Sequence, residues 1–195
     1  PNIFEQNPEF ISLDPRRNRA TQTLTAESLY NRCKVIVPPF MVEHKTVLDL
    51  GCALGGMGHF ALTAGCRYYT GVDISDFYIN TSNQLLSKFW DKGRYNIVHQ
   101  DVEEFLDDAI EVGQRWDYVI ASGILYSFVD VASILKKISQ VTKEKDQPCV
   151  QNVVPESLGQ NICKLASDIH PESTANSNNS TREKQKTSLK TGQKI

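Results

Sequence analysis

The stretch Val47-Leu48-Asp49-Leu50-Gly51-Cys52-Ala53-Leu54-Gly55-Gly56 decides the fold of this chain of 195 residues. A short apolar run that carries one aspartate leads directly into a turn with three glycines. Such a run is typical of a buried β-strand, and glycines allow a tight turn against which a ligand or the next helix packs closely. The stretch therefore predicts a strand, a glycine turn and a helix, and it leaves open which ligand the turn accepts.

Strand-like and helix-like segments alternate along the rest of the chain. A helix capped by Thr25 is expected to run to Ile36 and to stop at Pro38-Pro39. The expected strands are 46–50, 68–74, 95–99, 116–121 and 149–154. Further helices are expected after the glycine turn, Ser75, Asp101, Asp130 and about residue 156. The first of these should end near Gly65, the second should carry Ile79, Leu86, Phe89 and Trp90 on one stripe, and the third has Glu104 in capping-box spacing from Asp101.

The connections between these strands are too long for hairpins, so the strands must be parallel and joined by right-handed crossovers. The pattern predicts an α/β fold, a Rossmann-like doubly wound and mostly parallel sheet with helices on both faces. Ligands of such sheets bind outside the carboxyl ends of the strands, where the strand order reverses.

Composition and charge exclude several classes of protein. The net charge of −2 provides no general attraction to nucleic acid or to an anionic membrane, and no run of about 20 apolar residues is present to span a bilayer. The five cysteines form no CxxC pair, which indicates reduced thiols and no metal site. The N-terminal segment lacks the pattern of a secretory signal, so a cytoplasmic protein is expected.

The last 25 residues differ in composition from the rest of the chain. Ser, Thr, Asn, Gln and Lys dominate there, and such a segment buries too little apolar surface to offset its ordering entropy. The expected organisation is a helical N-terminal cover over residues 1–45, a core over 46–170 and a disordered polar tail over 171–195.

Three kinds of ligand compete for the glycine turn. A P-loop requires a lysine after its last glycine, but Met57 follows Gly56 here, so a triphosphate site is excluded. A dinucleotide fingerprint requires glycine where this chain has Ala53, which weakens that interpretation without excluding it. Asp49, two residues before Gly51, would repel a pyrophosphate and attract a cationic ligand.

The stretch resembles motif I of the class I S-adenosylmethionine (SAM)-dependent methyltransferases, which usually reads Asp-x-Gly-x-Gly-x-Gly, with Ala53 as a departure. Three further segments resemble the family in order: GVDIS at 71–75, HQDVEEF at 99–105 and WDYVIASGILYSF at 116–128. The resemblance covers roughly residues 45–155, and it implies SAM as the cofactor.

The resemblance also implies roles for individual residues. Asp73 would accept the protons of both ribose hydroxyls, Ile74 would lie on the adenine face, Asp101 would meet the adenine amino group, and the backbone N–H of Val102 would meet a ring nitrogen. The complete expected cofactor set is Asp49, Gly51, Cys52, Ala53, Gly55, Asp73, Ile74, Asp101, Val102 and Ala121.

The methyl acceptor leaves fewer marks on the sequence. The tip of the fourth strand reads Ala121-Ser122-Gly123-Ile124, which lacks the Pro-Pro motif of enzymes that methylate nucleobase amino groups. A small-molecule acceptor with a reactive oxygen or nitrogen is therefore expected, with Tyr126 as the candidate acceptor contact or base. The arginines Arg16, Arg17 and Arg19 suggest the hypothesis of an anionic acceptor, against the alternative of a solvated basic turn.

The family's sheet usually ends in an antiparallel strand hairpin, and too few residues follow position 154 to form one before the polar tail. The C-terminal hairpin is therefore expected to be missing. Two alternative functions stay open: a non-catalytic, methyltransferase-like binding or regulatory module, and an NAD-binding oxidoreductase.

Overall fold

The computed structural model describes residues 1–16, 24–143 and 149–151, all of which belong to one compact unit, Pro1–Val153. The helix expected at about 156–166, the polar tail at 171–195 and the arginines at 17 and 19 lie outside the described residues.

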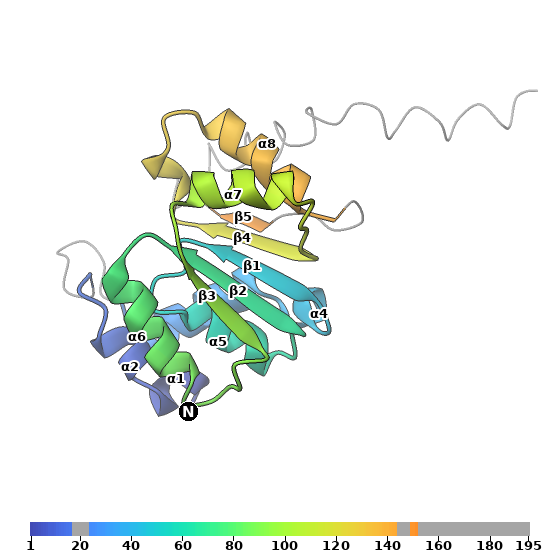
Figure 1. Cartoon of the computed structure of the whole chain (residues 1–195). Coiled ribbons are helices and arrows are strands. Elements are labelled where there is room, and N and C mark those ends of the chain that lie inside the picture. Colours follow the sequence, from blue (N-terminus) through green and yellow to red (C-terminus); the bar gives the residue numbers. More distant parts are fainter. Residues whose placement is uncertain (17–23, 144–148, 152–195) are drawn as a thin grey trace, which may run out of the picture. The chain divides into compact units, whose positions relative to one another are not determined.

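A five-stranded parallel sheet forms the centre of this unit, with the strand order β3-β2-β1-β4-β5 (Figure 1). Its strands are β1 (Thr46–Leu50), β2 (Tyr68–Asp73), β3 (Tyr95–His99), β4 (Tyr118–Ser122) and β5 (Cys149–Gln151). The chain moves outward from β1 to β3 and then returns to the other side of β1, so the order reverses between β1 and β4. This arrangement confirms the predicted fold class.

Three strand boundaries differ from the prediction. β2 ends at Asp73, because Ile74 has already left the ladder that pairs β2 with β3. β4 begins at Tyr118, because Trp116 makes only an isolated bridge to Thr142. β4 also ends one residue later than predicted, at Ser122.

Helices cover both faces of the sheet. Successive side chains of a strand point to opposite faces, so the apolar side chains on each face are buried under helices. Val47, Tyr69 and Ile120 belong to the core beneath α3 (Ala26–Ile36), α5 (Gly56–Thr63) and α6 (Asp76–Leu86). Leu48 and Val119 belong to the core beneath α7 (Val102–Glu111) and α8 (Val131–Val141).

Three short helices were not predicted: α1 (Ile3–Gln6), α2 (Glu9–Ser12) and α4 (Pro39–Val42). Each has four residues, which is too short for a helical repeat of apolar positions to be visible. Phe4 and Phe10 from α1 and α2 are nevertheless fully buried in the same core as α5. The N-terminal segment is therefore part of the core packing.

Helix ends mostly follow the predicted caps. The Thr25 hydroxyl accepts from the Ser28 N–H at 3.0 Å, and the Asp130 carboxylate accepts from the Ser133 N–H at 3.0 Å. Asp101 accepts from the N–H groups of Glu103 and Glu104, but the Glu104 side chain does not reciprocate, so the expected capping box is incomplete.

One further prediction about helices was wrong in part. α6 begins after Ser75 as predicted, although the Ser75 side chain makes no capping bond. Phe89 and Trp90 follow the end of α6 at Leu86, and they pack from the segment that comes after the helix. The glycine-turn helix ends at Thr63, just before Gly65, whose φ of +88° is left-handed as expected of a cap.

Candidate cofactor site at the carboxyl ends of the strands

The glycine turn after β1 is held against the end of β2. The backbone N–H groups of Gly51 and Cys52 both donate to the carbonyl oxygen of Val72, at 2.8 and 3.0 Å. Gly51, Ala53 and Gly55 have φ values of +74°, +49° and +73°. Ala53 therefore adopts the left-handed conformation in which glycine is usually found, at a cost of about 1–2 kcal/mol. The departure at this position leaves the shape of the turn intact.

Little space remains above the first glycine. A Cβ built on Gly51 would lie 2.8 Å from Cδ1 of Ile124, which comes from the loop after β4. The glycine thus lets the turn approach the tip of β4 closely. Cys52 beside it is buried, and burial raises the pKa of its thiol well above the usual range. It serves as a small apolar residue of the turn and carries no thiolate at neutral pH.

Asp73 is fixed at the end of β2 by two backbone donors. Its Oδ2 accepts from the Ala53 N–H and its Oδ1 accepts from the Ser75 N–H, each at 3.0 Å. Each carboxylate oxygen has a second lone pair, so the group keeps the capacity to accept two more hydrogen bonds. This pre-oriented carboxylate suits a vicinal diol.

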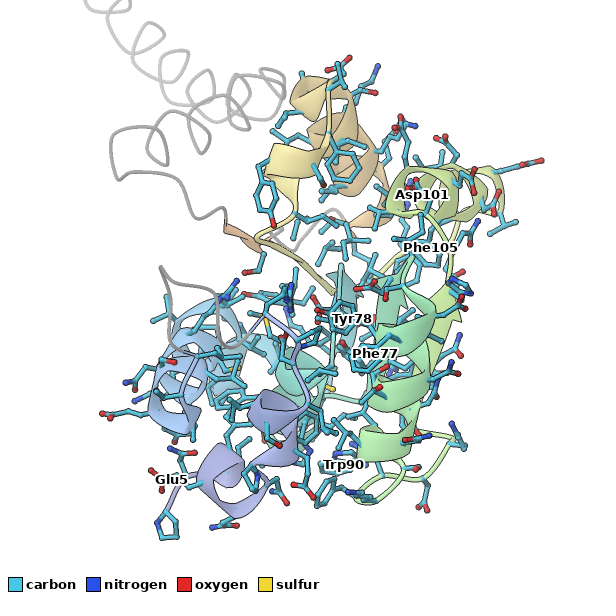
Figure 2. All side chains as sticks on the ribbon, turned by 90° about the vertical axis from the view of Figure 1, so that its left-hand side faces the viewer. Glu5, Phe77, Tyr78, Trp90, Asp101 and Phe105 are labelled. Atoms are coloured by element: carbon cyan, nitrogen blue, oxygen red, sulfur yellow. The ribbon has the colours of Figure 1, made fainter. Side chains whose placement is uncertain are left out.

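The neighbouring strand end holds the residues expected at an adenine. Asp101 caps α7 through Oδ1, while Val102 is the first helical residue, whose N–H has no acceptor within the helix. Figure 2 labels Asp101 at the start of α7. Ile74 is 66% exposed, and its carbonyl oxygen lies 2.8 Å from Nε2 of His99 on β3. The ends of β2 and β3 therefore bring these residues side by side.

Asp49 lies beneath the turn and is only 3% exposed. Its Oδ2 accepts a hydrogen bond of 2.8 Å from the hydroxyl of Tyr69. Burial raises the pKa of Asp49 to about 7, although the Tyr69 hydrogen bond and the charge of Arg32 oppose that rise. Near neutral pH the carboxyl group is therefore divided between its protonated and ionised forms. Its expected attraction for a cationic ligand stays a prediction.

The fourth-strand tip carries the remaining predicted residues. Ala121 is fully buried in the core under α7 and α8, and it pairs with Leu50 across β1 and β4. Tyr126 lies in the 3-10 turn Leu125–Ser127 and is 75% exposed. Within the described part of the chain its hydroxyl has no hydrogen-bond partner.

Arg16 is engaged by a neighbouring carboxylate. Its Nη2 lies 2.9 Å from Oδ2 of the buried Asp14, its guanidinium stacks over the Tyr78 ring at 5.0 Å, and the hydroxyl of Tyr78 also donates to Asp14. Asp14 accordingly raises the pKa of Arg16. Figure 2 shows Tyr78 on α6 beside the N-terminal segment. This pairing weakens the hypothesis that Arg16 binds an anionic acceptor.

Arg32 was not among the predicted site residues. It extends from α3 to the tip of β4, where its Nη2 donates to Oγ of Ser122 at 2.8 Å. A Cβ built on Gly123 would lie 3.3 Å from the same nitrogen. The sequence offered one signal: Arg32 borders the apolar face of Leu29, Cys33 and Ile36, whereas charged residues usually lie opposite such a face.

Away from the glycine turn, a hollow of about 460 Å³ is lined by His44, Gly65, Cys66, Arg67 and Arg94. These residues precede β1, β2 and β3, so the hollow lies at the amino ends of the strands, opposite the glycine turn. Among the described residues, no three His, Cys, Asp or Glu side chains are grouped to hold a metal ion. Nor does the described part contain a helix of the length and apolarity that a membrane span requires.

Comparisons with known proteins agree with this architecture. Residues 42–193 match the family model of a methyltransferase domain. No curated protein matches the chain in sequence. Among solved structures, a Streptococcus mutans protein thought to be a SAM-dependent methyltransferase superposes with a TM-score of 0.61 and 15% identity, over 73% of this chain and 39% of its own length.

Two other structures have chain lengths nearer to this one. A Pyrococcus horikoshii protein thought to be an RNA methyltransferase gives a TM-score of 0.53 and 19% identity, over 77% of this chain and 68% of its own. Magnesium protoporphyrin IX methyltransferase from Synechocystis PCC 6803, solved with bound SAM, gives 0.54 and 14%, over 84% and 83%. At these identities the likeness shows the fold alone.

Proposed function

The chain belongs to the methyltransferase-domain family, and from this premise we propose that it is a SAM-dependent methyltransferase that acts on an oxygen or nitrogen of a small-molecule acceptor. The observation that carries the proposal is the Asp73 carboxylate, held beside the glycine turn by the N–H groups of Ala53 and Ser75. It provides an acceptor for a ribose diol, and the turn offers no lysine for a phosphate.

The donor set fits a cofactor with an adenine, a ribose and no phosphate. Asp73 would hold the ribose hydroxyls, Asp101 and the Val102 N–H would hold the adenine edge, and Ile74 would cover the adenine face. When bound, SAM supplies a methyl group on a sulfonium, which is ready for in-line displacement. The contribution of the chain is to orient the two reactants and to exclude water between them.

A small acceptor is supported by charge. RNA binding depends on basic residues that neutralise phosphates, and the whole chain has a net charge of −2. One structural neighbour is named for a porphyrin and another for RNA, so the neighbours alone favour neither class. Tyr126, exposed at the tip of β4, is the residue that we propose to contact the acceptor.

Calorimetric titration with S-adenosylhomocysteine (SAH) tests the cofactor assignment. We expect the wild-type protein to bind SAH with a Kd of about 1 μM. Asp73→Ala removes an anionic acceptor of two hydrogen bonds and should weaken binding by at least about 100-fold. The control is Asp76→Ala, because the side chain of Asp76 on the first turn of α6 is 86% exposed, and this variant should bind like the wild type.

Other outcomes would select other functions. A folded wild-type protein that binds NAD and ignores SAH would favour an oxidoreductase. Binding of SAH without methyl transfer to any acceptor in a screen would favour the regulatory module. Retained SAH binding in Asp73→Ala would show that the ribose site lies elsewhere.

A further inference from the structure

The hollow at the amino ends of the strands lies far from the glycine turn. It has a volume of about 460 Å³, and it is lined by His44, Gly65, Cys66, Arg67 and Arg94. Arg67 directly precedes β2, whereas Asp73 is the last residue of that strand. A strand rises about 3.3 Å per residue, so about 20 Å separates the two positions. A ligand in the hollow would therefore occupy a site distinct from the proposed cofactor site.

Backbone hydrogen bonds bring the segments before β1 and β2 together at the hollow. The N–H of His44 donates to the carbonyl oxygen of Gly65 at 2.9 Å, and the N–H of Arg67 donates to the carbonyl oxygen of Lys45 at 2.7 Å. His44 and Gly65 both have left-handed backbone conformations, with φ values of +62° and +88°. The two segments thereby place an imidazole and a guanidinium at one hollow.

Arg94 contributes a second guanidinium from the residue before β3. Its Nη2 donates to the carbonyl oxygen of Cys66 at 2.8 Å, and its guanidinium lies over the Trp90 ring at 5.7 Å. In the described part of the chain, its Nε is buried without a hydrogen-bond partner. A guanidinium has five N–H donors, and the bond to Cys66 uses one of them. The fold thus holds this charge at the hollow and leaves most of its hydrogen-bonding capacity free.

Neither Arg67 nor Arg94 lies within ion-pair distance of an acid among the described residues. Glu43 stands beside the hollow, where its Oε1 lies 3.8 Å from Nε2 of His44. It offsets part of the positive charge without pairing with a guanidinium. Two guanidiniums at one hollow repel each other, and an anion between them would replace this repulsion with attraction. The charge of the hollow therefore favours an anionic ligand.

The thiol of Cys66 does not supply this anion. Burial raises the pKa of the thiol to about 12, although the charge of Arg94 opposes the rise. The thiol is therefore neutral near pH 7, and the charge of Arg94 acts inside the hollow. A negative group must come from a ligand.

We propose that this hollow is a second ligand site, in which Arg67 and Arg94 bind the phosphate group of a small phosphate monoester. Such a group carries about two negative charges at neutral pH and presents three oxygens. A guanidinium fork binds two oxygens at once, so two forks match a phosphate. The volume of about 460 Å³ lies within the range of about 300–1,000 Å³ that small organic ligands occupy. The site uses no residue of the proposed cofactor site and does not depend on the proposed function.

Calorimetric titration with glycerol 3-phosphate tests the site, in a buffer of low ionic strength that contains no phosphate. We expect the wild-type protein to bind this probe with a Kd of about 0.1–1 mM. Glycerol, which lacks the phosphate, should not bind at the same concentrations. Succinate has two carboxylates in place of the phosphate, and it should bind at least about 10-fold more weakly.

Three variants locate the binding. Arg67→Gln and Arg94→Gln each remove one fork and should weaken the binding of glycerol 3-phosphate by at least about 10-fold. Arg115→Gln is the matched control, because Arg115 is exposed and precedes β4 at the same end of the sheet but does not line the hollow. This variant should bind the probe like the wild type.

Thermal unfolding shows whether each variant is folded. Arg94→Gln removes the bond to the Cys66 carbonyl oxygen and can therefore destabilise the protein. Arg67 is exposed, and its side chain makes no hydrogen bond within the described residues, so Arg67→Gln should unfold at the temperature of the wild type. The comparison of Arg67→Gln with Arg115→Gln thus decides the question even where Arg94→Gln does not fold.

A loss of glycerol 3-phosphate binding in Arg67→Gln, together with unchanged binding in Arg115→Gln, is the result that the proposal requires. Equal losses in the two variants would show an effect of net charge alone, and unchanged binding in both would place the phosphate elsewhere. Either result would overturn the proposal. A wild-type protein that does not bind glycerol 3-phosphate below about 10 mM, or that binds succinate equally well, would overturn it too. None of these results affects the SAH titration, which tests the proposed function separately.

Discussion

The two carboxylates near the glycine turn differ in their surroundings, although each stands at a strand end. Asp73 accepts two backbone N–H groups and remains accessible for further hydrogen bonds. Asp49 is enclosed and has the Tyr69 hydroxyl as its hydrogen-bond donor. Because burial favours the neutral form of a carboxyl group, the pKa of Asp49 rises to about 7. The same residue type thus keeps free lone pairs at a strand end in one case and is held in the core in the other.

Removing the Tyr69 hydroxyl tests this hydrogen bond. In Tyr69→Phe we expect the free energy of unfolding to fall by about 1–2 kcal/mol near pH 5.5, because a buried acceptor loses its donor. The loss should be larger at pH 8.5. The Tyr69 bond lowers the pKa of Asp49, so its removal raises that pKa further, and a folded-state pKa raised above the unfolded value costs stability as pH increases through it.

Urea denaturation of wild type and Tyr69→Phe at the two pH values measures the effect. Tyr95→Phe is a suitable control, because its hydroxyl bond to the Asn83 carbonyl oxygen is long, at 3.4 Å, and involves no carboxylate. An equal loss for Tyr69→Phe at both pH values would show that the hydroxyl does not act on Asp49.

Two glycines make room for the Tyr69 ring and so determine how α5 and β2 pack. A Cβ on Gly58 of α5 would lie 2.3 Å from ring atoms of Tyr69, and a Cβ on Gly71 of β2 would lie 2.9 Å from its hydroxyl oxygen. The ring is fully buried, so it has little freedom to move aside. The helix after the glycine turn can approach the sheet only because both positions lack a side chain.

Gly58→Ala should therefore destabilise the protein, even though alanine favours a helix by about 1 kcal/mol over glycine. The expected loss is about 1–3 kcal/mol in the free energy of unfolding, since overpacking a dense core outweighs the helix propensity. Gly93→Ala provides the comparison, because nothing lies within 4 Å of its added Cβ. Urea denaturation should place Gly93→Ala within about 0.5 kcal/mol of the wild type. A Gly58→Ala variant as stable as the wild type would mean that Tyr69 shifts at little cost.

Prediction from the sequence succeeded for elements with local signals. β1 and β3 have the bounds expected from their apolar runs, and α3 has the Thr25 cap and Pro38 stop. Contacts between distant segments were not predictable. The Tyr69–Asp49 bond depends on the register in which Asp49 pairs with Gly71, and the Arg32–Ser122 bond joins residues that are 90 positions apart. The expected cofactor residues gather at adjacent strand ends, and their roles stay predictions.

At the scale of the whole molecule, a cluster of rings joins the N-terminal segment to the Rossmann-like core. His59 on α5 stacks on Phe10 with ring centroids 4.8 Å apart, contacts Phe89 at 4.7 Å, and its Nδ1 accepts from Nε1 of Trp90 at 3.1 Å. Because Nδ1 accepts, the neutral ring carries its hydrogen on Nε2. Burial lowers the pKa of His59 to about 4, so the cluster is built around an uncharged imidazole.

His59 and Asp49 make opposite contributions to the pH dependence of stability. Below its unfolded pKa of about 6.5, His59 takes up a proton only on unfolding, so its contribution to stability is lost as pH falls from about 6.5 toward 4. Asp49 is protonated in the folded state up to about pH 7, so its contribution is fully present below its unfolded pKa and is lost as pH rises toward 7. Between about pH 4.5 and 6, the contribution of His59 to the free energy of unfolding rises with pH, whereas that of Asp49 falls.

The last prediction uses this opposition. In Asp49→Asn, the pH dependence that His59 contributes to the free energy of unfolding is no longer opposed. Relative to the wild type, the free energy of unfolding of this variant should therefore fall by up to about 1.4 kcal/mol for each pH unit from 6 down to 4.5. His59→Asn, which keeps an acceptor for Trp90, should show the opposite trend. The free energy of unfolding of the double variant should change with pH as that of the wild type does. The two opposed contributions cancel in the wild type and are both absent from the double variant, and the other groups are the same in both proteins. Urea denaturation at pH 4.5, 5.25 and 6 measures all four proteins. Two single variants that change in the same direction with pH would contradict the assigned protonation states.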